Sequence, residues 1–568
     1  MSRHRQTPLP LAPVFAALCA TLVLLLFAIS CMTAKREAEV EEQPIAQPAS
    51  AAPQPQLDKG TRDRLQALGY TRGGNESGLA APQPAEMIAA DADIEMNTEE
   101  YGQIAENPFL ETLRNPLSTF SIDVDRASYS NVRRYLTEHQ RPPHDAVRIE
   151  EMVNYFSYDY PDPPANQPFS MTTEIASCPW NENNRLLLIG LQGRRIDTAD
   201  LPPGNLVFLI DVSGSMQEAN KLPLVKSALH LLVDQLRPQD RVAIVAYAGN
   251  AGLVLPSTPG SEKGSIHEAI EQLEAGGSTA GGEGILLAYK VAQENFLEGG
   301  NNRVILTTDG DFNVGVSSDG ELERLIEEKR RSRISLSVLG FGTGNVKDSK
   351  MELLADKGNG NYAYIDTIQE ARKVLVREIG ATLTTIAKDV KLQIEFNPTK
   401  VRAYRLIGYE NRLLRAEDFH DDTKDAGEMG AGHSVTALYE LVPLDSDQAA
   451  PAVDPLKYQT ATVPASASAS PELLTLKLRY KDPDAELSRL LTQPVLDGTT
   501  PITASSENLR FAAAVAELGL LLRESPHKGE ASYDQVAEMA SHALGGDQDG
   551  DRAEFLQLVS AASRLASK

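Results

Sequence analysis

The chain has 568 residues, a length typical of roughly two to four domains. Its apolar fraction of 42% and charged fraction of 23% exclude a collagen, a multi-span membrane protein and a wholly disordered chain. The 79 acidic residues outnumber the 54 basic residues, which gives a formal net charge of −25. A surface this acidic repels phosphate backbones, so nucleic acid is not an expected partner.

The N-terminus has the pattern of an export signal. A basic start precedes an uncharged apolar run over residues 14–29, and residues 28–31 (AISC) are similar to a bacterial lipobox. We therefore expect residues 1–30 to be a signal peptide and Cys31 to carry a lipid. The alternative is an uncleaved anchor, because the 21 uncharged residues of 9–29 are enough to span a bilayer.

Both alternatives place the body of the protein in the cell envelope, outside the cytoplasmic membrane, because a basic start stays inside. Residues 31–105 are rich in Ala, Gln, Glu and Pro. Such a segment buries too little apolar area to offset its chain entropy. We expect a disordered tether that a lipid anchor holds to the membrane, facing the periplasm or the exterior.

The central third of the chain alternates apolar strands with amphipathic helices. Strand patterns lie at residues 206–210, 242–247, 252–257, 304–307, 336–339 and 362–365. Helical patterns lie at residues 222–236, 266–273, 285–296, 322–331, 351–355 and 369–386. This alternation predicts an α/β fold, a doubly wound and mostly parallel sheet that helices cover on both faces.

Oxygen-bearing side chains follow two of these strands. Asp211, Ser213 and Ser215 come directly after residues 206–210, and Asp309 comes after residues 304–307. Thr279 lies between them in a glycine-rich loop. Ligands of an open α/β sheet bind beyond the carboxyl ends of its strands. Carboxylates and hydroxyls suit Mg²⁺, Mn²⁺ or Ca²⁺, so we expect a divalent metal site there.

These five residues resemble the metal-ion-dependent adhesion site of the von Willebrand factor A (VWA) family, which is DxSxS with a later Thr and a later Asp in TDG. The resemblance implies an octahedral cation, Mg²⁺ by preference, that Ser213, Ser215 and often Thr279 coordinate directly. It implies that Asp211 and Asp309 act mostly through bound waters. It also implies an open position that accepts a carboxylate from a partner protein.

The flanking segments resemble the bacterial YfbK-like VWA lipoproteins over about residues 110–568. The resemblance is carried by residues 118–125, 148–156, 411–414, 428–433 and 436–440. It implies an architecture and does not specify an activity.

The flanks also show strand-like runs with no helices between them. These runs are residues 169–176, 185–191, 390–396, 402–409, 434–441 and 473–480. They predict an antiparallel sandwich in which 165–200 and 387–482 pair as one sheet unit, with the VWA domain inserted. Residues 446–471 are expected to be a flexible loop, and residues 509–522, 533–544 and 555–565 are expected to be amphipathic helices.

The predicted divisions of the chain are therefore a signal peptide (1–30), a tether (31–105), an N-terminal α+β flank (106–203), a VWA domain (204–386), a β-rich domain (387–482) and a C-terminal helical segment (483–568).

Other polar groups carry weaker signals. Residues 547–551 start like a calcium loop but lack its later glycine and glutamate, which favours a solvated acidic turn. Asp123 and Asp125 alternate with apolar residues, which favours surface carboxylates or a helix cap over metal ligands. His267 and Glu271 have the spacing of a zincin motif without its second histidine.

We expect a binding module of the cell envelope that captures a partner protein through the metal. The alternative is a structural or assembly scaffold, in which the metal only stabilises the VWA domain. A metal-dependent hydrolase is disfavoured, because the pattern offers no free general base and no GxSxG nucleophile elbow. The chain is therefore not expected to be an enzyme.

Overall fold

A computed structural model describes residues 98–567, apart from residues 249–250, 278–280, 311–318, 381–383, 447–461 and 484. The chain divides into two units, Met1–Ala92 and Asp93–Lys568, and the described residues all belong to the second. The predicted signal peptide, Cys31 and most of the predicted tether lie outside the described residues. Within them, every helix is too short or too polar to traverse a bilayer.

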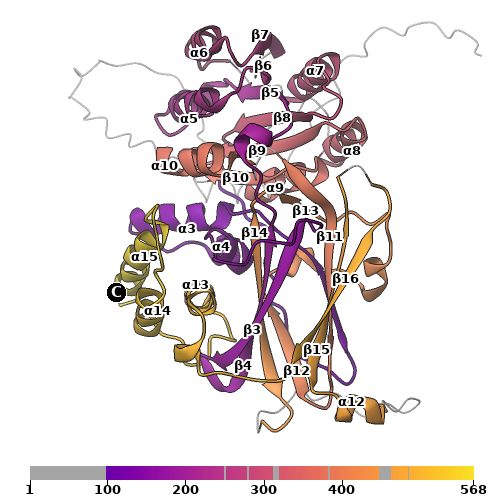
Figure 1. Ribbon diagram of the computed structural model, residues 1–568. Coiled ribbons are helices and arrows are strands. Elements are labelled where there is room, and N and C mark those ends of the chain that lie inside the picture. Colours follow the sequence, from indigo (N-terminus) through magenta and orange to yellow (C-terminus); the bar gives the residue numbers. More distant parts are fainter. Residues whose placement is uncertain are drawn as a thin grey trace, which may run out of the picture. The chain divides into compact units, whose positions relative to one another are not determined.

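The VWA-like part contains a six-stranded sheet of order β10-β9-β8-β5-β6-β7 (Figure 1). Its strands are β5 (Gly204–Asp211), β6 (Arg241–Tyr247), β7 (Ala251–Pro259), β8 (Asn301–Thr308), β9 (Ser335–Phe341) and β10 (Tyr362–Ile365). All neighbours are parallel except β6 and β7. The predicted strands and the predicted parallel sheet are confirmed.

Helices cover both faces of this sheet. Alternate residues of each strand point to opposite sides, so both faces carry apolar side chains. Val207 and Leu209 pack with α7 and α9, whereas Leu206 and Phe208 pack with α5 and α6. The helices are α5 (Leu222–Gln235), α6 (Lys263–Glu271), α7 (Gly281–Glu294), α8 (Asp319–Arg330), α9 (Asp348–Lys357) and α10 (Ile368–Arg372).

The helix predicted over residues 369–386 extends too far. Helical structure continues from α10 through a π-helical turn, Lys373–Arg377, but Thr385 already begins strand β11 (Thr385–Phe396). The side chain of Ile386 belongs to the core of the flanking sheets. Its apolar side chain satisfies a helical pattern and a strand pattern equally well, so the sequence did not mark the boundary.

The flanks form two antiparallel sheets with a shared core. The first has the order β1 (Leu110–Glu111), β12 (Val401–Ile407), β14 (Ser434–Pro443), β4 (Asn181–Gly193) and β3 (Phe169–Cys178). The second has the order β13 (Gly427–Gly430), β11, β15 (Glu472–Lys481) and β16 (Arg489–Leu496), with β2 (Leu117–Ser121) also paired to β11. Leu187 and Tyr439 of the first sheet pack against Leu392 and Leu476 of the second.

Strand β4 precedes the VWA-like part, and its partner β14 follows it. The predicted insertion of the VWA domain into a β-sandwich is therefore confirmed. The predicted single sheet unit is in fact two sheets. The loop predicted at 446–471 lies partly outside the described residues, and it contains a short helix, α12 (Ala465–Ala469).

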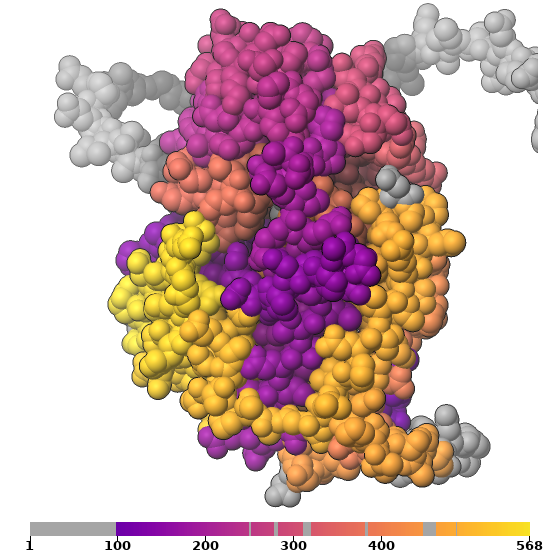
Figure 2. All heavy atoms as spheres, viewed as in Figure 1, coloured from indigo at the N-terminus to yellow at the C-terminus, as the bar shows by residue number. Residues whose placement is uncertain are grey.

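Three C-terminal helices, α13 (Glu507–Leu522), α14 (Tyr533–Ser541) and α15 (Asp551–Ala566), close the chain. They share a core with α3 (Ala127–Thr137), α4 (Ile149–Asn154) and the face of the first sheet that carries Leu186 and Leu188. Figure 2 shows these helices in yellow beside the purple N-terminal elements. The acidic turn before α15 is not merely solvated, because Asp551 pairs with the ammonium of Lys373 at 2.7 Å.

Candidate metal site

The carboxyl ends of β5 and β8 bring two buried aspartates to one edge of the parallel sheet. Ile210 pairs with Thr307, Asp211 is the last residue of β5, and Asp309 directly follows β8. Neither side chain is exposed to solvent. Gly310 follows with a φ of 99°, and a Cβ there would lie 2.6 Å from the backbone nitrogen of Lys347. The glycine of the TDG sequence is therefore required by the close backbone approach.

Several hydrogen bonds fix Asp211. Its Oδ1 accepts from the backbone N–H of Ser213 at 2.8 Å. Its Oδ2 accepts from the hydroxyls of Tyr247 at 3.1 Å and Thr308 at 3.4 Å. Burial raises the pKa of Asp211 to about 6, the bonds to Ser213 and Tyr247 oppose that shift, and the charge of Asp309 adds to it.

The serines of the motif lie directly after Asp211. Ser213 precedes a 3₁₀ turn, Gly214–Gln217, that contains Ser215. Their hydroxyl oxygens are 3.1 Å apart, and Ser215 is exposed whereas Ser213 is buried. Thr279, the remaining predicted ligand, lies outside the described residues. The structure thus brings Asp211, Ser213, Ser215 and Asp309 to one edge and leaves the place of Thr279 open.

Lys221 is the polar neighbour that the sequence did not indicate. It directly precedes α5, and its Nζ donates to Oδ2 of Asp309 at 3.2 Å. Its side chain is only 5% exposed. The hydrophobic pattern of the sequence does not distinguish this buried lysine from an exposed residue of a turn. Tyr247 was also missed, although it ends the predicted strand 242–247, and the structure places it opposite Asp211 in the parallel pair β5–β6.

The donor set fits a divalent cation. Two buried carboxylates carry two negative charges, and Lys221 supplies one positive charge, which leaves a net charge of −1 (−2 + 1). Oxygen donors without sulfur or imidazole suit Mg²⁺, Mn²⁺ or Ca²⁺. Asp211, Ser213, Ser215 and Asp309 are the described residues that would hold the ion.

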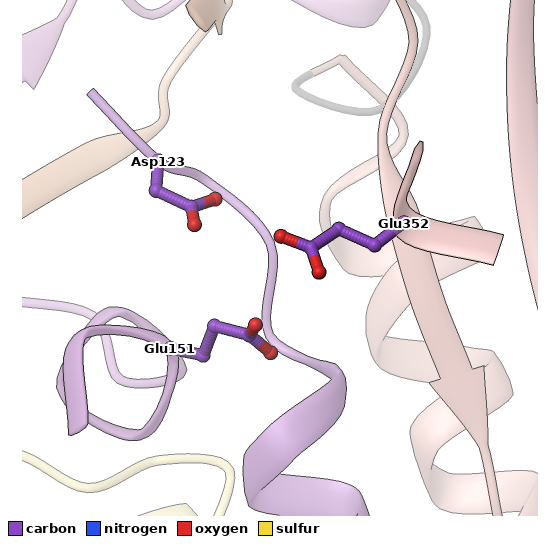
Figure 3. A group of neighbouring side chains, drawn as sticks. All are labelled: Asp123, Glu151 and Glu352. Atoms are coloured by element: carbon purple, nitrogen blue, oxygen red, sulfur yellow. The ribbon is translucent and has the colours of Figure 1, made fainter. Parts of the chain in front are cut away.

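A second acidic cluster lies between the VWA-like part and its flank. Asp123 follows β2, Glu151 lies on α4 and Glu352 lies on α9, and one carboxylate oxygen of each lies within 4.8 Å of the others. Figure 3 shows the three carboxylates turned toward a shared space. Asp123 and Asp125 lie beyond the end of β2 and are buried, so the expectation of surface carboxylates was wrong. The expectation of a helix cap was also wrong, because the N-cap of α3 is Arg126, whose side chain makes no capping hydrogen bond with the described residues of that helix.

Two guanidinium groups pair with this cluster. Arg412 donates to Asp123 at 3.0 Å, to Asp125 at 3.3 Å and to Glu352 at 3.0 Å, and it also contacts Asp356. Arg148 pairs with Glu151 at 3.1 Å and Asp348 at 3.4 Å, and it contacts Glu352. These contacts join α9 of the VWA-like part to the flank, and we interpret the cluster as a structural interface.

Comparison with known proteins identifies the family. Residues 205–376 match the von Willebrand factor type A domain, residues 381–565 match a family described as "Uncharacterized protein YfbK, C-terminal", and residues 95–188 match one described as "von Willebrand factor". "Uncharacterized protein YfbK" of Escherichia coli (strain K12) is 47% identical over 472 residues, which cover 82% of this chain and 81% of that protein. The chain belongs to the YfbK family of VWA-domain proteins.

Other similarities of this YfbK-family chain are partial. Human inter-alpha-trypsin inhibitor heavy chain H4 is 30% identical over 148 residues, which are 25% of this chain and 16% of that protein. The structure titled "von Willebrand factor type A from Catenulispora acidiphila" has a TM-score of 0.39 and 16% identity, covering 68% of this chain and 89% of that one. VWA domains mediate protein–protein interactions and commonly bind a divalent metal.

Proposed function

We propose that this YfbK-family protein is a cell-envelope binding module that captures a partner protein through a divalent metal. The metal would be held by Asp211, Ser213, Ser215, Thr279 and Asp309. Mg²⁺ is the preferred ion, and Mn²⁺ and Ca²⁺ suit the same donors. The observation that supports this most strongly is the pair of fully buried aspartates at the carboxyl ends of β5 and β8, where Lys221 pairs with Asp309.

The charge of this edge favours an acidic partner. A bound divalent ion supplies a Lewis acid with a coordination position for an anionic ligand. With the ion, Asp211, Asp309 and Lys221, the local charge is +1 (2 − 2 + 1), which attracts a carboxylate. Ser215 is exposed, so the serine end of the site is accessible to another protein. No bond in the partner is broken in this scheme.

The location is also a proposal. We infer from the N-terminal sequence that Cys31 is lipidated after removal of residues 1–30, which would tether the protein to a membrane of the envelope through residues 31–105. An exported and tethered module meets partners at the envelope. Retention of the chain in the membrane fraction, and its release when Cys31 is replaced by serine, would support this location.

A scaffold remains the second candidate, and the buried cluster around Arg412 favours it. That cluster makes the VWA-like part and the flank one continuous structure, as a permanent assembly element requires. In this alternative the metal stabilises the VWA domain and partner contacts do not depend on it.

Cross-linking in intact cells distinguishes the two functions. We compare the wild type, the wild type with a chelator, Asp211→Ala, and the control Glu294→Gln on the exposed face of α7. The binding module predicts a cross-linked species that is lost with the chelator and with Asp211→Ala but persists in the control. The same species in all four samples, with Asp211→Ala folded by circular dichroism, would favour the scaffold.

A further inference from the structure

Two histidines from different helices meet outside the oxygen-donor site. His230 lies on α5 and His267 on α6, and their ring centroids are 4.7 Å apart with an interplanar angle of 38°. Their Nδ1 atoms are 2.5 Å apart. His267 is the histidine of the incomplete zincin pattern. The second histidine is supplied in space by α5, 37 residues earlier in the chain.

The outer nitrogen of each ring faces a carboxylate. Nε2 of His230 lies 2.7 Å from Oε1 of Glu271, and Nε2 of His267 lies 3.2 Å from Oδ1 of Asp234. An ionised carboxylate can only accept, so each Nε2 carries the hydrogen and donates. A neutral imidazole with hydrogen on Nε2 has a bare lone pair on Nδ1. The two bare lone pairs therefore face one another across the gap between the helices.

Two lone pairs at this distance repel, so a cation lies between them: a shared proton at the present 2.5 Å, or a metal ion when the rings separate. A histidine that binds a metal through one nitrogen usually donates its other N–H to a carboxylate, which fixes the tautomer. Both His230 and His267 have that arrangement. Lys226 and Lys263 lie at the outer rim, where Lys226 pairs with Glu271 and Lys263 donates to the carbonyl of Asp234. Lys226 therefore offsets the charge of Glu271.

The geometry accommodates a metal after a small movement. Zinc binds histidine nitrogen at about 2.0–2.1 Å, and two such bonds at a tetrahedral angle place the nitrogens about 3.3 Å apart. The rings would separate by about 1 Å from their present 2.5 Å. Both side chains have room for this, since 26% of His230 and 30% of His267 is exposed. Their exposure also leaves positions for water to complete the coordination.

We infer that His230 and His267 form a two-histidine binding site for a borderline divalent transition metal, Zn²⁺ or Cu²⁺, through their Nδ1 atoms. Glu271 and Asp234 orient the rings. The site differs in donor chemistry from the edge of the sheet, where the ligands are oxygen atoms, so it does not depend on the proposed function. A bound ion would fasten α5 to α6.

The experiment uses the untagged full-length chain at pH 8 with saturating Mg²⁺. The Mg²⁺ keeps oxygen-donor sites filled, and the high pH limits competition by protons for the histidine nitrogens. Cu²⁺ binding is followed by electron paramagnetic resonance, and Zn²⁺ binding by calorimetry. We expect one Cu²⁺ per chain with hyperfine structure from two nitrogens, and one Zn²⁺ site. His230→Ala and His267→Ala should each abolish both signals. Glu271→Gln should weaken Zn²⁺ binding by roughly tenfold.

The matched control is His542→Ala, because His542 is an exposed histidine at the end of another helix, α14. It should retain the wild-type stoichiometry and spectrum. The inference is wrong if wild type and His230→Ala bind the same number of ions, or if the spectrum shows a single nitrogen. In that case the two rings share a proton, and they do not bind a metal. Circular dichroism on each variant verifies that these surface substitutions leave the fold intact.

Discussion

Lys221 links the fold to the proposed metal chemistry at the scale of single residues. Its ammonium contacts Asp309 inside the protein, where Asp211 is also buried. A buried carboxylate that loses a charged partner typically destabilises a protein by several kcal/mol. The lysine therefore stabilises the metal-free fold, and a divalent ion supplies the same kind of stabilisation from outside.

Lys221→Met tests this relation. Without metal, we expect the variant to lose about 3 kcal/mol of unfolding free energy, because the two aspartates lose that positive charge. Mg²⁺ should raise its melting temperature by more than it raises that of the wild type. Thermal unfolding with and without Mg²⁺ measures both effects. Lys290→Met, an exposed change on α7, is the control and should resemble the wild type. Equal Mg²⁺ shifts in Lys221→Met and wild type would contradict this role.

Glu517 gives a pH-dependent prediction. The side chain is fully buried on α13, where Oε1 accepts from the N–H of Ser532 at 3.0 Å and Oε2 has no hydrogen-bond partner among the described residues. Burial raises the pKa of Glu517 to about 7. The folded state therefore binds a proton that the unfolded state releases between about pH 4.5 and pH 7. Its contribution to stability is fully present below about pH 4.5 and is lost as the pH rises through 7.

The comparison with Glu517→Gln isolates this contribution. We expect the stability of the wild type relative to the variant to increase by about 3 kcal/mol between pH 8 and pH 4.5. Urea unfolding across this range measures it. Glu538→Gln, at an exposed position of α14, should follow the wild type at every pH. Parallel pH curves for wild type and Glu517→Gln would show that Glu517 does not titrate in this way.

At the scale of elements, α9 is the connection between the VWA-like part and the flank. Glu352 and Asp356 on α9, together with Asp123 and Asp125 after β2, surround the guanidinium of Arg412. Because four carboxylates share Arg412 as a counter-charge, we expect replacement of this arginine to destabilise the cluster most. Burial raises the pKa of Asp125 well above its ordinary value, an effect that the neighbouring carboxylates add to and Arg412 opposes.

Arg412→Met should therefore be strongly destabilising, by about 3–5 kcal/mol, because several buried carboxylates lose their counter-charge. Arg415→Met is the matched control, since the Arg415 side chain is 73% exposed and its surface pairs contribute little. Chemical denaturation of both variants measures the difference. Similar loss of stability in the two variants would mean that the Arg412 cluster does not hold the interface together.

The sequence predicted strands well where burial on both faces determines the residue pattern. Strands β5 and β8 are buried on both faces, so their apolar runs are unbroken. Strand β16 was missed because most of its side chains are exposed and its apolar residues follow no alternation. The end of α10 was misplaced because the apolar residues of β11 continue its pattern. The weakest predictions were thus at boundaries and at exposed strands.

At the scale of the whole molecule, the sequence predicted the insertion but not the contacts that it creates. Strands β4 and β14 are both largely buried strand-like runs, so their pairing across the VWA domain was a reasonable expectation. The burial of Asp123 depends on Arg412, 289 residues later in the chain. Lys221 likewise reaches Asp309 across 88 residues. Local patterns carry no information on such pairs, which explains why the motif residues were found and their charged neighbours were not.

The central claim is that the edge formed by β5 and β8 binds a divalent cation. The most direct test is a calorimetric titration of the full-length chain with Mg²⁺ and with Mn²⁺ at pH 7.5, beside Asp309→Ala. We predict one saturable site in the wild type that Asp309→Ala abolishes. The absence of saturable binding in the wild type, or an unchanged isotherm in Asp309→Ala, would contradict the account.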